Sequence, residues 1–543
     1  MIRPFASAPA LLLCSLLSLS AAPASRADVP APGAQTPRPG AAQLKDMLNR
    51  SSAGFFNPMT IPTDPVPLKR LYTEWDETRA LAVSTSLVDA IREVKVQDFY
   101  RELIAAAIQH VDVVVCYDNF ESKHLIHFEK LLLQNPTIAT HASRLSFAES
   151  RAASFWIRDF GPIFALSREN QLIAIDTIYR NVEGEMETFV NAPLDLDSPD
   201  LQQDLNAFIS FRKEGRQLDV TPPYLAKHIR QTLSIDCDIV RPPLTLQGGD
   251  FIADGAGNVF ISEDTILLNG GNKRLVVETI QDYFEAKEVH VLNAFPGNAA
   301  RHLDLMLKFL SDEVVLYSKA PDTTSSQSAS ARLLARQAKQ AQDTNLAYLS
   351  KKFPRLRQVP LPSPALIEDS PAMVTSTIVA QVLATVCEEI GINYLSYLAL
   401  PQGDPKKLSA DKMIAKHFHS TVGKALNFNN REDLDLAAQH FLHAPLEQLE
   451  SVHVSYTTVY RSYANSIILK HAKGTTLLLP RYRPAKGETL EQMQEMEKQV
   501  EAAYATAFPK ATFEWINSDY MAKELGALHC VSITIPQVAP LDD

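Results

Sequence analysis

Residues 251–292 read FIADGAGNVFISEDTILLNGGNKRLVVETIQDYFEAKEVHVL and show a succession of local patterns. The apolar runs Phe251–Ala253 and Val259–Ser262 flank a turn of small and polar residues, which predicts a β-hairpin. A helical stretch, Arg274–Ala286, follows, and the apolar run Val289–Leu292 predicts a further strand. This part of the chain therefore predicts the order strand, strand, helix, strand.

Parts of the same order recur along the chain. Hairpin patterns lie at Ile163–Ile175, Leu305–Tyr317 and Ser466–Pro480, and the last is followed by the helical stretch Leu490–Ala507 and the apolar run Thr512–Ile516. The repetition favours an α/β fold built as a cyclic array of ββαβ modules around a central site. A generic α/β domain with several hairpins explains the spacing equally well.

The N-terminus has the features of a secretion signal. Arg3 supplies a positive charge, Ala10–Ala22 is a short run of small and apolar residues, and Ser25 and Ala27 are the small residues that a signal peptidase reads. A membrane anchor is the alternative, but the apolar run is too short to cross a bilayer comfortably. We therefore expect residues 1–27 to be removed, leaving a secreted or periplasmic protein that has no membrane segment.

The remainder of the 543-residue chain is expected to hold one large domain. Residues 28–70 begin with a run rich in Pro, Ala and Gly and predict a flexible N-terminal segment, followed by a single folded domain over 71–543. Three polar or charged stretches within that domain predict surface insertions that shape access to a site. These stretches lie at about 190–230, 320–365 and 401–455.

Charge and cysteine content narrow the function classes. The formal net charge of −11 disfavours a nucleic-acid partner and mildly favours cationic substrates. Cys116, Cys237, Cys387 and Cys530 lie far apart and form no CxxC pair, which argues against a zinc site. One or two disulfides among the first three of these cysteines are compatible with the sequence.

The segment 301–310, RHLDLMLKFL, is the most informative for chemistry. Its apolar residues alternate strictly, which predicts a strand with one buried face. On such a strand His302 and Asp304 share the other face, about 7 Å apart, and offer an imidazole and a carboxylate to one pocket. Taken alone, the exposed polar face of an edge strand explains the pair better.

Three further segments are each ambiguous. Trp156–Pro162 (WIRDFGP) places Asp159 in an Arg-Asp pair before a hairpin, which is equally typical of a structural ion pair. Gln247–Asp250 (QGGD) allows close backbone approach before a strand, but no Lys-Ser/Thr follows that would indicate a phosphate loop. His529 and Cys530 precede a terminal strand, where a buried structural cysteine is a common occurrence.

Taken together and in this order, these motifs resemble those of the guanidine-modifying (pentein) superfamily. Within it, they are most similar to agmatine deiminases and bacterial peptidylarginine deiminases, over roughly residues 72–540. The resemblance implies a propeller of five ββαβ modules, in agreement with the repeats above, carrying surface insertions. It also implies hydrolysis of a guanidinium C–N bond on a small-molecule or peptide substrate, without a metal or organic cofactor.

The resemblance assigns a role to each motif. Cys530 would be the nucleophile, His302 would shuttle protons, and Asp159 and Asp304 would grip the guanidinium. A planar cation with several N–H donors is bound well by paired carboxylates. Other residues of the same motifs complete the expected substrate-binding set: Trp156, Gln247 and Asp250.

One position departs from the family pattern. Agmatine and free-arginine deiminases carry Glu before the paired glycines, where this chain has Gln247, and a neutral amide does not hold the histidine as an imidazolium in the way that a carboxylate does. The departure and the signal peptide favour peptidyl-arginine over agmatine. An amidinotransferase and a catalytically inert guanidine-binding protein stay open as alternatives, and the sequence does not define an oligomeric state.

Overall fold

The computed structural model describes the chain between residues 62 and 538. Residues 1–61, 119–121, 151–153, 180–217, 295–300, 322–328, 368–377, 393–404, 447–459 and 539–543 lie outside the described part, as do a few single residues. The predicted signal peptide, 1–27, and most of the predicted flexible segment, 28–70, therefore fall outside it.

The stretch 251–292 forms the predicted ββαβ unit. Strands β8 and β9 make an antiparallel hairpin, helix α12 follows, and strand β10 returns parallel to β9. Asn272 caps the start of α12 by accepting a hydrogen bond from the backbone N–H of Leu275. The elements span Phe251–Ala253 (β8), Asn258–Ser262 (β9), Lys273–Phe284 (α12) and Glu288–Leu292 (β10).

Three more units repeat this order, each with a hairpin, a helix and a third strand that joins the sheet of the hairpin in parallel. The first contains β5 (Ile163–Ser167), β6 (Leu172–Ile175), α10 (Thr221–Thr232) and β7 (Cys237–Val240). The second contains β11 (Leu307–Phe309), β12 (Val314–Ser318), α13 (Ala329–Lys352) and β13 (Arg357–Leu361). The third contains β14 (Ile467–His471), β15 (Gly474–Arg481), α19 (Leu490–Ala505) and β16 (Thr512–Asn517).

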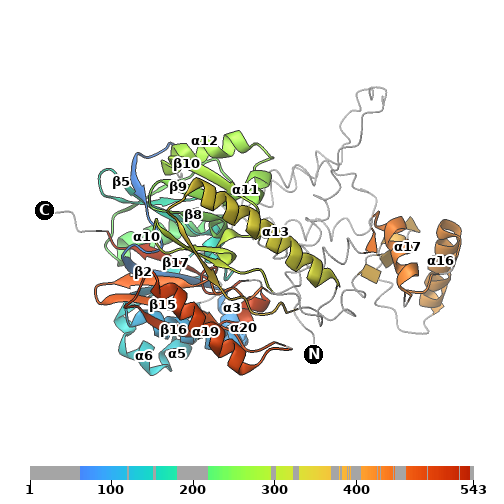
Figure 1. Ribbon diagram of the computed structural model, residues 1–543. Helices are drawn as coiled ribbons and strands as arrows, with labels where there is room; N and C mark the ends of the chain where they lie inside the picture. The colour runs from blue at the N-terminus through green and yellow to red at the C-terminus, as the bar shows by residue number, and fades with distance from the viewer. Residues whose placement is uncertain are drawn as a thin grey trace, which may run out of the picture.

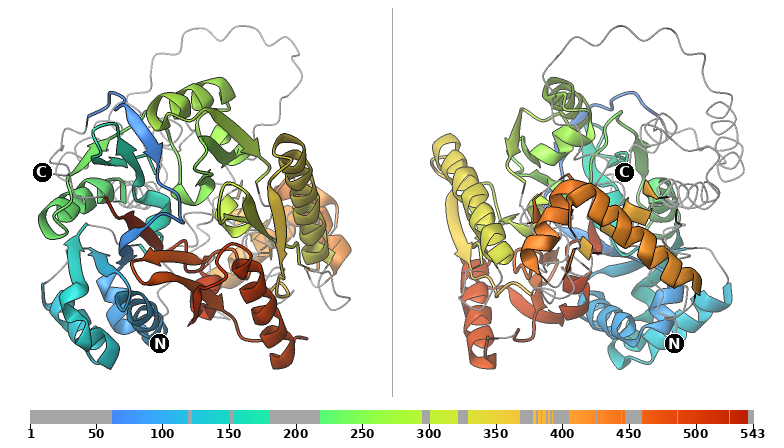
Figure 2. Two further views of the ribbon diagram at one scale, coloured as in Figure 1. Left: turned by 60° about the vertical axis from the view of Figure 1, so that its left-hand side comes forward. Right: turned by 90° about the vertical axis from the view of Figure 1, so that its right-hand side faces the viewer.

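The fifth sheet joins the two ends of the described chain. Its strand order is β17-β2-β3-β4, and the C-terminal strand β17 runs antiparallel to β2, with Ser532 opposite Val83. The left view of Figure 2 shows the sheets following one another around the molecule in chain order, with the red C-terminal part beside the blue N-terminal part. The elements are β2 (Thr78–Thr85), α4 (Val94–Ile108), β3 (Asp112–Tyr117), β4 (Leu145–Glu149) and β17 (Ser532–Pro536).

Two of the predicted boundaries differ from the structure. The stretch 320–365 is not an insertion, because it contains α13 and β13, which complete a ββαβ unit. The basic, polar surface of α13 suggested an addition, yet Leu334 and Ala338 bury its inner face. Within 28–70, strand β1 (Leu68–Leu71) pairs with β5 and is ordered structure.

The other two predicted insertions are described only in part. Residues 190–217 lie outside the described part, and the rest of that stretch supplies α10, the helix of the first sheet's own unit. In the stretch 401–455, α16 (Pro405–Val422) and α17 (Arg431–Phe441) lie beside each other at one side of the molecule (Figure 1). They share a small hydrophobic cluster with Val382 and Val386.

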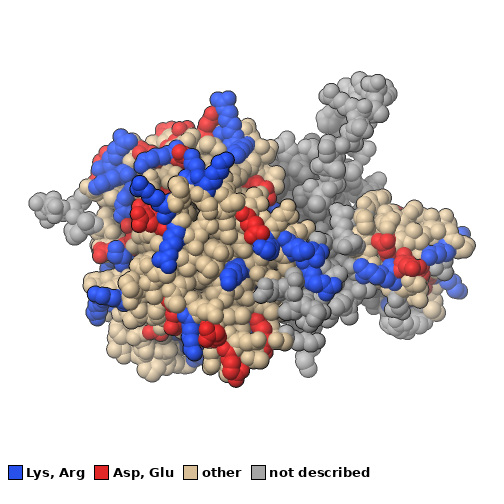
Figure 3. Space-filling view, viewed as in Figure 1, with Lys and Arg blue, Asp and Glu red and all other residues tan. Residues whose placement is uncertain are grey.

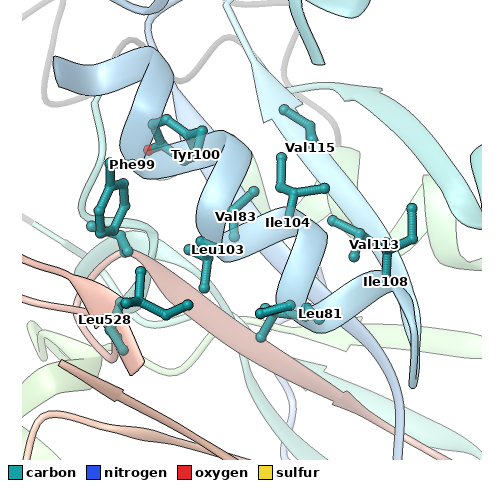
Figure 4. Packing of buried hydrophobic residues seen from close by; sticks show 14 of the residues in the cluster. Leu81, Val83, Phe99, Tyr100, Leu103, Ile104, Ile108, Val113, Val115 and Leu528 are labelled. Carbon is teal, nitrogen blue, oxygen red and sulfur yellow. The ribbon is translucent and has the colours of Figure 1, made fainter. Parts of the chain in front are cut away.

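The fifth sheet anchors the segment that carries Cys530. Helix α4 packs Leu103 and Ile104 onto β2 and β3, and Leu528 packs into the same cluster (Figure 4). Leu528 is fully buried and lies two residues before Cys530. Burial of one leucine side chain contributes about 1.5–3 kcal/mol, so this contact fixes the backbone next to the thiol.

The surface and the cysteines add further structural facts. All four described cysteines are free thiols, so the structure holds no disulfide among Cys116, Cys237 and Cys387. None of the helices in the described part combines the length and the apolar composition that a bilayer crossing requires. On the face shown in Figure 3, basic and acidic side chains of the described residues are interspersed.

A buried arginine, Arg461, links the unit that contains β14 and β15 to the unit that contains β13. Arg461 is fully buried and donates hydrogen bonds to the carbonyl oxygens of Arg483 and Ala365, both at 2.7 Å, and to Glu488 Oε2 at 2.6 Å. We expect Arg461→Met to lower the free energy of unfolding by about 3–5 kcal/mol, because Glu488 then stays behind without its charged partner. Urea unfolding measures the change.

The matched control is Arg274→Met. Arg274 forms an exposed ion pair with Glu278, which solvent screens, so its loss should leave the free energy of unfolding nearly unchanged. Equal effects of the two substitutions would contradict the structural role assigned to Arg461.

Candidate active site

The structure brings together the four residues that the sequence motifs placed in a catalytic role. Asp159 lies in the short helix α7 (Ile157–Phe160), His302 and Asp304 lie at the 3-10 helix η3 (Leu303–Leu305), and Cys530 precedes β17. His302 Nδ1 lies 3.4 Å from Asp159 Oδ1, and Cys530 Sγ lies 3.6 Å from Asp304 Oδ2. None of the four is more than 9% exposed.

The local structure of 301–310 differs from the predicted strand. Residues 303–305 form a 3-10 helix, and the strand begins only at Leu307. The alternating apolar pattern was misleading because the whole segment 302–310 is buried, so the polar positions do not face solvent. His302 and Asp304 reach the site through this turn, which follows the left-handed backbone of Arg301 at φ 50°.

Gln247 takes the position from which it can orient the histidine. Its Oε1 lies 2.6 Å from His302 Nε2 and accepts that N–H, while Asp159 faces the other ring nitrogen. Burial acts to lower the pKa of His302, but the charges of Asp159 and Asp304 outweigh it and raise the pKa above its usual value. An amide oxygen thus supplies the acceptor that the family pattern provides with Glu, and nearby carboxylates supply the charge.

Asp250 has a structural role through one of its two carboxylate oxygens. Its Oδ2 accepts hydrogen bonds from Ser262, through the backbone N–H at 3.1 Å and the hydroxyl at 2.7 Å, and from Thr265 at the start of helix α11 (Glu263–Leu268). Burial raises its pKa to about 6, against the charge of His302 and these hydrogen bonds. The structure therefore uses one oxygen of the predicted substrate-binding residue Asp250 to hold the β9–α11 junction.

Asn465 organises the thiol and was not assigned a role from the sequence. Its Nδ2 lies 3.1 Å from Asp304 Oδ2 and 3.2 Å from Cys530 Sγ, and its Oδ1 accepts from the backbone N–H of His529 at 3.0 Å. A single asparagine in a sequence carries no recognisable chemical signal. Its contribution emerges only where β14 and the Cys530 segment meet.

The charge distribution keeps the thiol protonated. Burial raises the pKa of Cys530 well above its usual value, and the charges of Asp304 and Asp159 add to this effect. Burial also raises the pKa of Asp159 to about 6, although the nearby His302 acts to lower it. Burial acts in the same way on Asp304, but the hydrogen bond and charge of His529 outweigh it and leave its pKa below the usual value.

Two glycines have their side-chain space occupied by site residues. A Cβ on Gly526 would lie 2.3 Å from the Trp156 ring and 3.1 Å from Cys530 Cβ, so the predicted substrate-binding Trp156 packs beside the thiol. A Cβ on Gly249 would lie 2.5 Å from His302 Nδ1. The paired glycines of the QGGD segment thus admit the imidazole rather than a phosphate.

The sheets and the buried Cys–His–Asp site define an α/β protein of the class that modifies guanidine groups. The family model of the Porphyromonas-type peptidyl-arginine deiminases matches residues 70–536. The chain therefore belongs to this family of peptidyl-arginine deiminases.

Two solved structures are among those to which the chain is similar. The agmatine deiminase of Enterococcus faecalis is 16% identical, with a TM-score of 0.51 over 87% of this chain and 96% of that chain. The agmatine deiminase of C. jejuni is 14% identical, with a TM-score of 0.48 over 86% of this chain and 96% of that chain. At such identities the likeness to the E. faecalis enzyme shows a shared fold. No curated protein matches the chain significantly.

The close approach of His302 to Gly249 generates a prediction. Gly249→Ala must displace the imidazole, and we expect kcat for a guanidine substrate to fall at least about 10-fold, as is typical when a general acid–base group is misplaced. Steady-state kinetics measures the loss. Gly270→Ala is the control, because no atom lies near its Cβ and its positive φ costs only stability, about 1–2 kcal/mol. Equal kcat values for the two variants would refute the constraint.

The negative charge beside Cys530 generates a second prediction. Asp304→Asn removes a carboxylate 3.6 Å from the thiol, so the pKa of Cys530 should fall. We expect iodoacetamide to alkylate Cys530 several-fold faster at pH 8 in this variant than in the wild type. Parallel labelling of Cys530→Ala subtracts the other cysteines, and an unchanged or slower rate would show that Asp304 does not control the thiol.

Proposed function

We propose that this protein is a secreted cysteine hydrolase that converts a guanidinium group into a ureido group and ammonia through a covalent thiouronium intermediate. The observation that carries the proposal is a set of buried acceptors beside the thiol. Asp304 Oδ1 is buried and has no hydrogen-bond donor among the described residues, and Asp159 Oδ1 is buried with only the ion-pair contact to His302 Nδ1 at 3.4 Å and no hydrogen bond. A guanidinium group carries five N–H donors in a plane and provides the donors and the positive charge that such oxygens require.

Binding of the cation prepares the nucleophile. A positive charge held between Asp159 and Asp304 offsets the two carboxylates that keep Cys530 protonated, so the thiol proton leaves to solvent and the thiolate forms. The thiolate sulfur then bonds to the guanidinium carbon and gives a neutral tetrahedral adduct. The site is therefore activated by its own substrate.

His302 handles the protons of the following steps. As an imidazolium held by Gln247 and Asp159, it protonates one amino group of the adduct, the C–N bond breaks and ammonia leaves. The neutral imidazole then takes a proton from water, whose oxygen bonds to the thiouronium carbon. Cleavage of the C–S bond releases the ureido product and the Cys530 thiolate, and a proton is lost from the product.

We infer an arginine side chain within a peptide or protein as the substrate, with agmatine as the second candidate. The predicted signal peptide and the family's description support peptidyl-arginine. Gln247 supports it as well, since it departs from the Glu of agmatine deiminases and still fills the acceptor position for His302. We also infer that the five ββαβ units close into a propeller, which the pairing of β17 with β2 supports.

The test is an assay of residues 28–543 with agmatine, free arginine and a short peptide with internal arginine. We expect ammonia and ureido product in equal amounts from the peptide, and none from Cys530→Ala. Mass spectrometry of the quenched reaction should show the thiouronium adduct on Cys530 of the wild type. Agmatine as the preferred substrate would overturn the peptide assignment alone.

Other outcomes select the alternatives. Amidino transfer to an added amine, with no ammonia released in its absence, would identify an amidinotransferase. Binding of all three compounds without turnover would identify an inert guanidine-binding protein. Persistent adduct without ureido product would place the defect in hydrolysis, the step in which His302 activates water.

A further inference from the structure

The histidine that precedes the nucleophile bridges two carboxylates. His529 Nδ1 lies 2.7 Å from Asp304 Oδ2, and His529 Nε2 contacts Glu74 Oε1. The side chain of His529 is 4% exposed and that of Asp304 is 3% exposed. Sequence motifs placed His529 next to Cys530 but gave it no role, and they gave Glu74 none.

Donor and acceptor chemistry defines the state of this bridge. Ionised carboxylates only accept hydrogen bonds, so an imidazole that satisfies one at each nitrogen must donate from both. His529 therefore donates one ring N–H to Glu74 and the other to Asp304. Removal of either carboxylate takes away one of the two acceptors that fix this arrangement.

Lys308 holds the outer end of the bridge. It is 3% exposed, contacts Glu74 Oε2 and donates to the carbonyl oxygen of Ser466 at 2.8 Å. Burial acts to raise the pKa of Glu74, but the charges of His529 and Lys308 hold it well below its usual value. Arg158 lies beside the segment that carries His529 and Cys530, since its backbone nitrogen donates a hydrogen bond to the carbonyl oxygen of Cys530 at 3.1 Å.

The bridge also borders a cavity. Glu74, Lys308 and Asp304 line a cavity whose wall also includes Tyr72 and Glu77. Of the four predicted catalytic residues, only Asp304 belongs to that wall, while its Oδ2 lies 3.6 Å from the thiol. Asp304 thus has the thiol on one side and, on the other, a charged pair that reaches water through Glu74, whose side chain is 29% exposed.

We propose that Glu74 and His529 form a positioning pair that keeps Asp304 ionised and oriented, so that its free oxygen is ready to bind the guanidinium. This inference rests on the proposed function, because it assigns Asp304 to substrate binding. His529 and Asn465 both engage Oδ2 of Asp304, which leaves Oδ1 as the buried oxygen without a donor among the described residues. The pair therefore decides which oxygen meets the substrate.

The electrostatic surroundings show why Asp304 depends on this pair. Full burial opposes its ionisation, and of the cations near it His529 alone is hydrogen-bonded to it. Without His529, the remaining neighbours include Asp159 and Cys530, whose negative forms oppose the charge of Asp304. The titratable and charged groups that face Asp304 are His529, His302, Arg158, Lys308, Asp159 and Cys530.

The test is Glu74→Gln, which keeps an acceptor but removes the charge. Asp159, with a pKa near 6, should govern the acid limb of kcat/KM in the wild type, because Asp304 titrates lower. In the variant we expect KM at pH 7 to rise at least 10-fold and the acid limb to move to higher pH. At pH 8.5, where Asp304 is again ionised, KM should return to within about threefold of the wild-type value, which a merely structural defect would not do.

Glu77→Gln is the matched control, because Glu77 lines the same cavity, is exposed and has no side-chain contact with His529. Its pH profile should match the wild type. His529→Asn, which keeps an N–H beside Asp304 but no charge, tests the pair from the inner side and should reproduce the shift. Profiles of Glu74→Gln and His529→Asn that match the control, or losses that no increase in pH restores, would overturn the proposal.

A second readout separates this inference from the proposed function. In a Cys530→Ala background, calorimetry measures the binding of agmatine and of the arginine peptide without turnover. Glu74→Gln should weaken binding at pH 7 at least 10-fold and less at pH 8.5. A wild type that binds but does not turn over would refute the proposed function and leave this result standing, whereas equal affinities with and without Glu74 would refute the positioning pair alone.

Discussion

The structure depends on a concentration of buried negative charge around one thiol. Asp159 and Asp304 lie beside Cys530 in a buried site, and burying a carboxylate costs several kcal/mol unless a partner offsets it. The segments that surround the site supply those partners: the turn before β14 contributes Asn465, and the turn before β17 contributes His529. These partners do not satisfy Oδ1 of Asp159 or Oδ1 of Asp304 with a hydrogen bond among the described residues, and a planar cation between the two carboxylates would supply the missing donors.

Much of the fold could be predicted from local patterns. The four hairpins and the helices after two of them follow from apolar periodicity and turn residues, because these features are decided within about 40 residues of chain. The unit containing α13 was missed because its helix has a basic, polar outer face that suggested an insertion. The pairing of β17 with β2 has no local signal at all, since it joins the two ends of the described chain.

The candidate site was predicted in part. The motifs identified Asp159, His302, Asp304 and Cys530, and the structure brings them within contact distances. The prediction of a strand at His302 was wrong. Alternation of apolar and polar residues is typical of a strand with one buried face, but here the polar residues are buried as well and residues 303–305 form a 3-10 helix. Glu74 and Asn465 could not be found from the sequence, because their importance comes only from tertiary contacts with distant residues: Glu74 contacts His529, 455 positions away, and Asn465 contacts Asp304, 161 positions away.

The pairing of β17 with β2 has a consequence for how the protein comes into being. Glu74 and His529 are 455 positions apart, so a growing chain contains Asp159, His302 and Asp304 long before it contains the nucleophile. Catalytic competence therefore depends on the pairing of the last segment with β2, because the same segment brings Cys530 and His529 to Asp304.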